Sequence, residues 1–385
     1  MIYNSSAFGP VYLWINSAEF RFDEIIEWKN HVQRTKSGKD LIVRVRGKPR
    51  KKFRYTNSAK NSNLKNSIFH NLAHGPLVQK WGIANWGRLQ KRTIPIGTTQ
   101  ILVDEKWPIE GLLLIWKSFQ EHRVIEYYRT FENLVFYEPL DQDWIDSYIV
   151  PIEIGRIYNL SYRSTGIYGS FQFNLETDIH DNLQEEESDY SQVVQFNNQD
   201  VFFGFHHYSD PKGWLDQYDK EVDIFDKEIG RISAHTDKSS TRHIRKVIFY
   251  QESIEELSEF LNWIYRRAGR YRSFYSPSWN RDLEILQSDF IETEFYIADE
   301  YSELDIQGLA FRTTAGSWLI RGVVGISEVI QGILKVTLQT SLEMLPSEIE
   351  RVSFLKQYAL AGDEVEIRHF GNFNSECELE IEERF

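Results

Sequence analysis

Residues 242–279 read RHIRKVIFYQESIEELSEFLNWIYRRAGRYRSFYSPSW, and this stretch decides how the surrounding chain folds. Its first part, 242–250, predicts a basic strand because it combines Arg and Lys with β-branched and aromatic residues. Ser253 followed by Glu256 forms a capping-box pattern, and the apolar residues that follow recur at helical spacing. The sequence therefore predicts an amphipathic helix over 254–267.

The end of this helix is also marked in the sequence. Arg266 and Arg267 place positive charge at the helix C-terminus, and Gly269 can adopt the left-handed geometry that often follows a helix. A weaker helical stretch at 60–74 ends in the same way, at Gly75-Pro76. We therefore expect one helix in each half of the chain.

Short runs of β-branched and aromatic residues follow both predicted helices. These predicted strands are 100–103, 112–116, 124–128 and 134–137 in the first half, and 295–298, 318–324 and 333–338 in the second. One helix packed against several mostly antiparallel strands makes a mainly β or α+β fold. Each half is thus expected to be an antiparallel β-sandwich or barrel flanked by one amphipathic helix.

The two halves resemble each other in sequence, as expected of tandem copies. Seven short matches keep a separation of 193 to 197 residues. They include Arg50-Lys51 and Tyr55 with Arg245-Lys246 and Tyr250, Gly75 with Gly269, Trp81 and Trp86 with Phe274 and Trp279, residues 101–105 with 296–300, Gly111-Leu112 with Gly308-Leu309, and PIEIGRI at 151–157 with PSEIERV at 346–352. We predict a first β-rich repeat over 1–195 and a second, acidic repeat over 196–385.

Length and composition limit the class of protein. With 385 residues, 41% of them hydrophobic, the chain can form two domains with packed cores. It contains no apolar run long enough to cross a bilayer, and its first residues do not form a secretory signal. We therefore expect a soluble, unsecreted chain. The single cysteine, Cys377, lies between two glutamates that disfavour a reactive thiolate.

Charge is distributed unevenly along the chain. Residues 29–92 contain seventeen Lys and Arg and one acidic residue, Asp40, a net charge of +16, so the remainder of this chain of net charge -13 carries -29. A basic block can bind phosphates, and it can equally dock on an acidic surface of a neighbouring copy. Because the same chain supplies both charges, we favour docking between subunits.

Basic residues at alternate positions between 44 and 54 would project from one face if they lay on a single strand. The predicted interface residues are Arg44, Arg46, Lys48, Arg50, Lys52 and Arg54 in the first half, and Arg245, Lys246, Arg267, Arg270 and Trp279 in the second. Two alternatives stay open. The stripe at 44–54 could bind nucleic acid, or the many aromatic residues could make a module that binds carbohydrate or a receptor.

Catalytic, cofactor and metal sites are not expected. His70 and His74 lie four residues apart on a predicted helix, but the glutamate of a metalloprotease helix is missing between them. Neither a nucleophile elbow nor a phosphate-binding glycine loop occurs. The paired carboxylates Asp104-Glu105 and Asp299-Glu300 are expected in turns, because adjacent residues on a strand point to opposite faces.

The order of features in the second half resembles the distal tail proteins of long-tailed bacteriophages and gene transfer agents. A basic strand at 242–250 is followed by a helix that ends in Arg266-Arg267-Ala268-Gly269-Arg270, and then by Phe274 and Trp279. The match covers about fifty residues. It departs from the family in having Thr236-Asp237 where a glycine precedes the strand, and in being duplicated.

The resemblance implies a tail-tube-like fold and a structural role without enzymatic activity. Members of this family form a ring at the tip of the tail that joins the tail tube to the hub and fibres. By this resemblance the partners would be other copies of the chain in a ring of three or six, the tail tube protein, the hub and fibre proteins. No membrane or nucleic-acid partner is expected, and assembly would occur in the host cytoplasm before the protein joins the virion.

Overall fold

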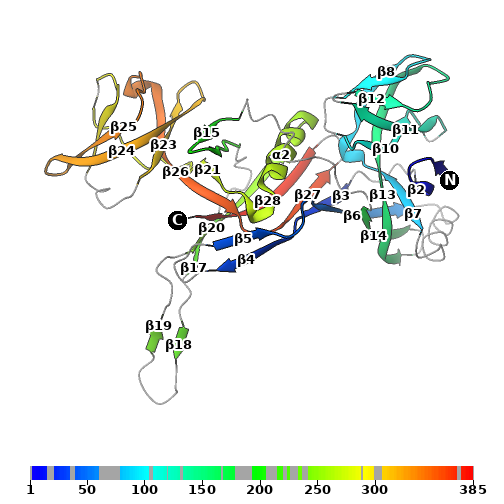
Figure 1. The fold of residues 1–385 in the computed structure, drawn as a ribbon, viewed down its shortest axis with the longest axis horizontal. Helices are drawn as coiled ribbons and strands as arrows, with labels where there is room; N and C mark the ends of the chain where they lie inside the picture. Colours follow the sequence, from blue (N-terminus) through cyan, green and yellow to red (C-terminus); the bar gives the residue numbers. More distant parts are fainter. Residues whose placement is uncertain are drawn as a thin grey trace.

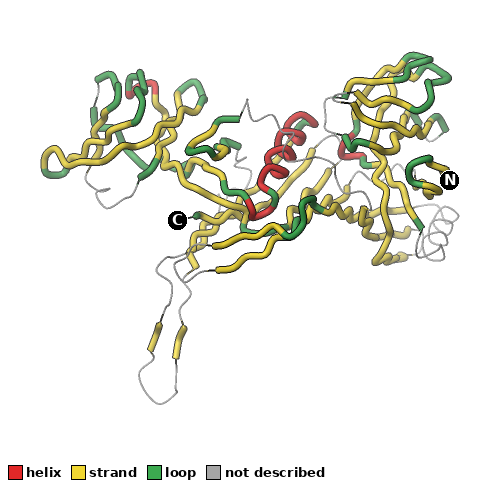
Figure 2. The backbone as a smooth tube through the Cα atoms, in the orientation of Figure 1, coloured by secondary structure: helices red, strands yellow, loops and turns green. Residues whose placement is uncertain are grey.

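The structure is a computed structural model of the whole chain. It describes residues 2–14, 21–34, 40–59, 79–103, 107–118, 120–130, 133–165, 168–177, 193–204, 215–219, 223–225, 233–235, 242–287, 289–298, 306–370 and 374–384. Nearly all of the regular structure is antiparallel β-sheet (Figure 2). The prediction of a mainly β protein is therefore confirmed.

The first half consists of strands, with one short 3-10 helix, η1, among the described residues. The elements are β1 (Ile2–Ser5), β2 (Gly9–Trp14), β3 (Arg21–Glu27), β4 (Asn30–Arg34), β5 (Asp40–Arg44), β6 (Arg50–Ala59), β7 (Lys80–Ala84), η1 (Trp86–Arg88), β8 (Gln90–Ile94), β9 (Gln100–Leu102), β10 (Glu110–Trp116), β11 (His122–Thr130), β12 (Asn133–Phe136), β13 (Trp144–Thr165) and β14 (Tyr168–Thr177). The predicted helix at 60–74 and its stop at Gly75-Pro76 lie outside the described residues.

The described residues of the second half form further strands, one α-helix and two 3-10 helices. The elements are β15 (Gln195–Phe196), β16 (Gln199–Asp200), β17 (Leu215–Asp219), β18 (Asp223–Phe225), β19 (Ser233–His235), β20 (Arg242–Gln251), α2 (Ile254–Arg267), η4 (Gly269–Tyr271), β21 (Phe274–Pro277), β22 (Glu294–Ala298), β23 (Gly308–Thr313), β24 (Trp318–Ile330), β25 (Ile333–Leu338), η6 (Pro346–Glu348), β26 (Ile349–Leu360), β27 (Glu364–Phe370) and β28 (Asn374–Glu383). All seven predicted strand runs overlap strands of the structure.

The order of strand pairing in the first half recurs in the second. Six pairings of the first half have a counterpart in the second half. In the first half they are β6–β14, β7–β13, β10–β13, β10–β11, β11–β12 and β9–β12. Their counterparts, in the same order, are β20–β28, β21–β26, β23–β26, β23–β24, β24–β25 and β22–β25. A parallel contact also recurs, because β2 runs along β7 and Val201 bridges to Tyr275.

A continuous antiparallel sheet runs through the middle of the molecule (Figure 1). Its strand order is the distal part of β13 (161–165), β14, β6, β3, β27, β28, β20 and β17. The first four strands come from the first half and the last four from the second. The pairing of β3 with β27, over Arg21–Glu27 and Glu364–Phe370, therefore joins the two halves.

The buried residues of the described chain form four large clusters and a smaller fifth one, which contains Phe196, Val201, Tyr275, Ala310 and Leu355. One central cluster gathers side chains of β6, β7, β13 and β14, and the other gathers side chains of α2, β20, β27 and β28. The remaining two large clusters fill the lobes formed by β8–β12 and β22–β25 (Figure 1). On β10, the side chains that lie in the lobe alternate with side chains of a central cluster. On β23, Leu309 and Phe311 lie in the lobe, whereas Ala310 between them lies in the small fifth cluster.

The helix α2 has the bounds that the sequence predicts. The Ser253 side chain accepts a hydrogen bond from the backbone N–H of Glu256, at 3.1 Å, and caps the N-terminus. Phe260, Trp263 and Ile264 are buried against the sheet, where Trp263 stacks on Phe202 with 3.9 Å between ring centroids. Figure 2 shows the helix lying on one face of the sheet.

The chain leaves α2 through two successive residues in the left-handed region. Ala268 has φ of 52° and Gly269 has φ of 68°. A side chain at position 269 would also meet Asp363, whose Oδ1 lies 2.5 Å from where a Cβ would be placed. The glycine is thus needed both for the backbone turn and for the close approach of the β26–β27 connection.

Several of the seven predicted sequence matches are wrong in register. Lys51 and Tyr55 on β6 are buried, whereas their predicted matches Lys246 and Tyr250 on β20 are only partly buried. Leu112 lies in a central cluster, whereas its predicted match Leu309 lies in a lobe cluster. Pro346–Glu348 form the 3-10 helix η6 before β26, whereas Pro151 lies inside β13, opposite Leu113. In the second half, Phe354 takes this position within the pairing, opposite Leu309. The similar letters of the two segments therefore do not occupy similar places in the two pairings.

No helix in the described part of the chain is both long and apolar enough to span a membrane.

Candidate assembly interface

The predicted basic stripe does not lie on one strand, and that prediction is wrong. Arg44 is the last residue of β5, whereas β6 begins at Arg50, and the residues between them form a bend. Arg46 and Lys48 lie in this bend, where the Arg46 guanidinium lies near Glu27 and donates to the Lys48 carbonyl at 2.9 Å. The Arg44 Nε donates to the Arg46 carbonyl at 3.1 Å.

Only Arg50, Lys52 and Arg54 share a strand, and each has an acidic partner across the sheet. Arg50 lies 3.2 Å from Glu176 on β14, and Lys52 contacts Glu27 on β3. Arg54 lies 3.1 Å from Asp23 and 3.7 Å from Glu366. Acidic side chains on the strands at both sides of β6 therefore balance much of its positive charge.

The contact between Lys52 and Glu27 shifts the pKa of both groups. The hydrogen bond to Glu27 raises the pKa of Lys52. Burial by itself would raise the pKa of Glu27, but the hydrogen bond and charge of Lys52 outweigh it, so the pKa of Glu27 is lowered. Both shifts favour the charged pair, which makes this edge of β6 a poor site for a phosphate.

The predicted basic residues of the second half divide into buried and exposed positions. Arg245 is buried, with its Nε 2.6 Å from Oδ1 of Asp216 and its Nη1 2.8 Å from the Ser278 carbonyl. Lys246 faces solvent and lies 2.6 Å from Glu380. Arg245 therefore holds β17 and the start of the second lobe in place, and it is not part of an exposed surface.

Arg267, Arg270 and Trp279 also have roles inside the chain. Arg267 is buried, contacts Asp200 and donates to the Ser273 carbonyl at 2.9 Å. Arg270 lies 3.5 Å from Asp363. Trp279 is 7% exposed, and its carbonyl accepts a hydrogen bond from Arg351 at 2.8 Å. Of the eleven predicted interface residues, four therefore make contacts inside the chain: Arg245, Arg267, Arg270 and Trp279.

A buried charge cluster at the joint between the halves was missed by the sequence analysis. Glu24 on β3 is fully buried, and its carboxylate lies 3.5 Å from Lys51, 3.3 Å from Arg88 and 3.3 Å from His369 on β27. Burial by itself would raise the pKa of Glu24, but the charges of Arg88 and Lys51 and the contact with His369 hold it far below its ordinary value. The charged glutamate thus links four elements of the sheet region.

A second carboxyl group, that of Glu153, lies in the same cluster, and its pKa is shifted in the opposite direction. Burial raises the pKa of Glu153, which the charges of Lys51 and Arg88 only partly offset. The Asn85 side chain donates to Glu153 at 3.0 Å. Adjacent residues in sequence give no sign of this cluster, because its members come from β3, β6, η1, β13 and β27 and meet only in the folded chain.

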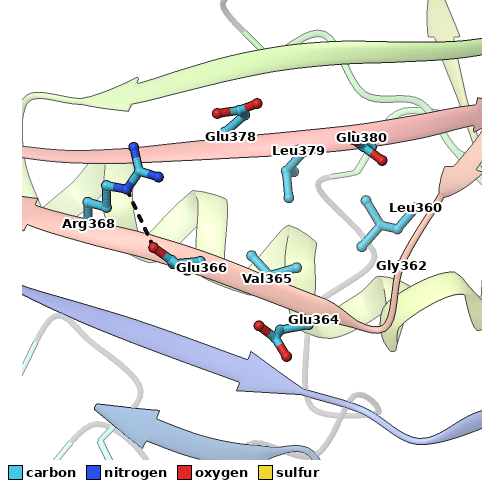
Figure 3. Close-up of a pocket in the computed structure, with 9 residues that line it drawn as sticks. All are labelled: Leu360, Gly362, Glu364, Val365, Glu366, Arg368, Glu378, Leu379 and Glu380. Carbon is cyan, nitrogen blue, oxygen red and sulfur yellow. Dashed lines mark hydrogen bonds and ion pairs between the residues drawn. The ribbon is translucent and has the colours of Figure 1, made fainter. Parts of the chain in front are cut away.

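A cavity of about 290 Å³ lies where β28 changes partner from β26 to β27. Its lining residues are Leu360, Gly362, Glu364, Val365, Glu366, Arg368, Glu378, Leu379 and Glu380. Figure 3 shows the four glutamates around it, with Arg368 turned toward Glu366, 3.5 Å away. The described residues contain no group of three or more potential ligands that could hold a metal ion.

The other predicted polar sites cannot be placed. His70 and His74, and both predicted carboxylate pairs at 104–105 and 299–300, lie outside the described residues. Cys377 is buried in the sheet, and burial raises the pKa of its thiol far above the ordinary value. It stays protonated at neutral pH, in keeping with the weak nucleophile that the sequence predicts.

No known protein family matches this chain, and a search among curated proteins finds no relative.

Proposed function

We propose that this chain is a structural, non-enzymatic subunit that forms a ring at the distal end of a long bacteriophage tail. One observation carries the proposal: the central sheet consists of two successive sets of four strands in the same order. A surface that joins one set to the next inside a chain can join chains in the same way. Such head-to-tail contacts close into rings when the rotation between units permits.

The proposal includes a tandem duplication, with repeats at 1–195 and 196–385. The recurring order of strand pairing supports it, together with the paired central and lobe clusters of buried residues. The buried side chains also recur, because Phe53 pairs with Leu175 on β14 and Val247 pairs with Leu379 on β28. Unrelated halves would have no reason to repeat six pairings in one order.

Two repeats in each chain set the expected size of the ring. Three chains would supply six similar units around a pseudo-sixfold axis, and six chains would form a larger two-tier collar. The position at the tail tip rests on the resemblance of residues 242–279 to distal tail proteins. The tail tube, the hub and the fibres would be the partners on the two faces of the ring.

The ion pairs of β6 favour this function over nucleic-acid binding. Arg50, Lys52 and Arg54 face acidic side chains of the same sheet, so a phosphate backbone would have to displace them. Docking between copies needs no such displacement, because the charges can stay paired while strands add to the sheet.

Two measurements test the proposal. Light scattering of the purified chain should give the mass of three or six copies, and a gold-labelled antibody against the chain should mark the distal end of the tail on intact virions of the phage that encodes it. A monomer at virion-like concentrations, or label on the capsid, would overturn it.

A further inference from the structure

The central sheet ends at two strands that have one strand neighbour each among the described residues. At one end, residues 161–165 of β13 pair only with β14. At the other end, β17 pairs only with β20. Terminal strands of this kind can add a further strand through their backbone groups unless the chain protects them.

These two terminal strands take the same positions as the two strands that join the halves. β27 pairs with β28 on one side, as residues 161–165 pair with β14. β3 pairs with β6, as β17 pairs with β20. Inside the chain, β27 and β3 meet along their other edges, over seven residue pairs. If the four-strand order repeated again, β17 would pair with residues 161–165. A single chain cannot make this pairing, because the two strands lie at opposite ends of its central sheet.

Large apolar side chains are buried on β3 and exposed on β17, as expected if β17 lacks a neighbouring strand that β3 has. On β3, which has strands on both sides, Phe22 is 4% exposed and Ile25 is 7% exposed. On β17, Leu215 is 57% exposed and Tyr218 is 66% exposed. Large apolar side chains on a terminal strand are usually replaced by charged ones when no partner covers them.

We propose that β17 of one chain pairs antiparallel with residues 161–165 of a second copy, so that the central sheet continues from chain to chain. This inference rests on the proposed function and names its interface. The strand directions fit this pairing. Neighbouring strands are antiparallel through all eight strands of the central sheet, so residues 161–165 of the next copy would run antiparallel to β17. Each added copy would cover Leu215 and Tyr218 as β27 covers Ile25.

The hairpin that follows each of these strands supports the same arrangement. β4 and β5 follow β3 and reach the second half, where the Asn30 side chain donates to the Ala268 carbonyl at 2.9 Å and to Asp363 at 2.7 Å. β18 and β19 follow β17 in the same way and extend from the rest of the chain (Figure 1). In the continued sheet this second hairpin would reach the neighbouring copy.

Cysteine cross-linking of the assembled chain tests the pairing. One double variant combines Leu215→Cys with Ser161→Cys, and a second combines Leu215→Cys with Arg163→Cys. Two positions are tested because opposite and diagonal positions on neighbouring strands are within about 8 Å. A short bismaleimide cannot join the two positions within one chain, since seven strand spacings separate them by about 30 Å. Cys377 is 1% exposed and does not compete in the folded protein. The matched control combines Leu215→Cys with Leu286→Cys, an exposed site in the second lobe.

The inference predicts a ladder of cross-linked dimers and trimers for at least one of the two test pairs and none for the control. A closed ring without these cross-links would overturn the strand pairing and leave the proposed ring standing. Cross-linked dimers from Leu215→Cys alone would show β17 meeting its own copy and would also overturn it. A monomer would overturn both.

Discussion

Glu24 and His369 are 345 residues apart in the sequence, and Oε2 of Glu24 lies 3.3 Å from Nε2 of His369 in the folded chain. The contact exists because β3 pairs with β27 and brings the two halves into one sheet. Gly87 approaches the same histidine so closely that a Cβ there would lie 2.7 Å from Nδ1. The joint is therefore a tightly packed site, in which the glutamate charge lies close to Lys51 and Arg88.

Glu24→Gln is predicted to destabilise the chain by about 3 kcal/mol, because it removes the carboxylate charge that faces two buried cations. Urea unfolding followed by tryptophan fluorescence measures this. The matched control is Glu27→Gln on the same strand, whose partner Lys52 is partly exposed, and its cost is predicted to stay below about 1 kcal/mol. Equal costs for the two variants would contradict the role given to Glu24.

The stability of the chain is predicted to fall more steeply in acid for the natural protein than for Glu24→Gln. The folded pKa of Glu24 lies below its ordinary value of 4.5, so its contribution is complete above that pH and is lost as the pH falls further. Glu153, with its raised pKa, has the opposite dependence. Burial is the largest cause of that shift and persists in Glu24→Gln, where only the smaller contribution of the Glu24 charge is lost. Urea midpoints between pH 7 and pH 3 check this, and parallel curves would refute it.

DNA binding by the β6 residues is predicted to be absent even at low salt. The acidic partners can be neutralised together in the variant Asp23→Asn, Glu27→Gln, Glu176→Gln, which leaves three cations without these charges. This variant should bind non-specific DNA with an affinity that falls steeply as salt is added. A mobility-shift titration compares the two proteins, and tight binding by the natural chain would revive the nucleic-acid alternative.

Asp363→Ala is predicted to loosen the joint of the β4–β5 hairpin with the end of α2. The Asp363 carboxylate accepts hydrogen bonds from the Asn30 backbone at 3.2 Å and from the Arg270 backbone at 3.1 Å, in addition to the Asn30 side chain. The expected loss is about 2 kcal/mol, with faster amide hydrogen exchange at Asn30 and Arg270. Glu364→Ala, at an exposed position of the next residue, is the control. Unchanged exchange in the aspartate variant would argue against this joint.

Local patterns in the sequence predicted much of the fold. The helix α2 was found in full, because its cap, its apolar spacing and its glycine all lie within the seventeen residues from Ser253 to Gly269. The seven strand runs were found because β-branched and aromatic residues gather in them. These signals depend on neighbours in the sequence, which is why they could be interpreted before the structure was known.

The candidate interface was harder to predict, because it depends on pairing between distant strands. The alternation of basic residues from Arg44 to Arg54 continues through a bend, so spacing alone gave one stripe where the chain makes two segments. Arg245 looked like a surface cation, but Asp216 on β17 and the Ser278 carbonyl bury it. The Glu24 cluster left no local signal, since its members come from five separate elements, β3, β6, η1, β13 and β27.

Cryo-electron microscopy of the assembled chain tests the central claim most directly. The account predicts a closed ring of three or six copies, in which the two halves of each chain occupy similar places and the sheet passes from β3 to β27 within a chain and from β17 to the next copy between chains. A single unassembled chain, a ring with neither threefold nor sixfold symmetry, or halves in unlike environments would contradict it.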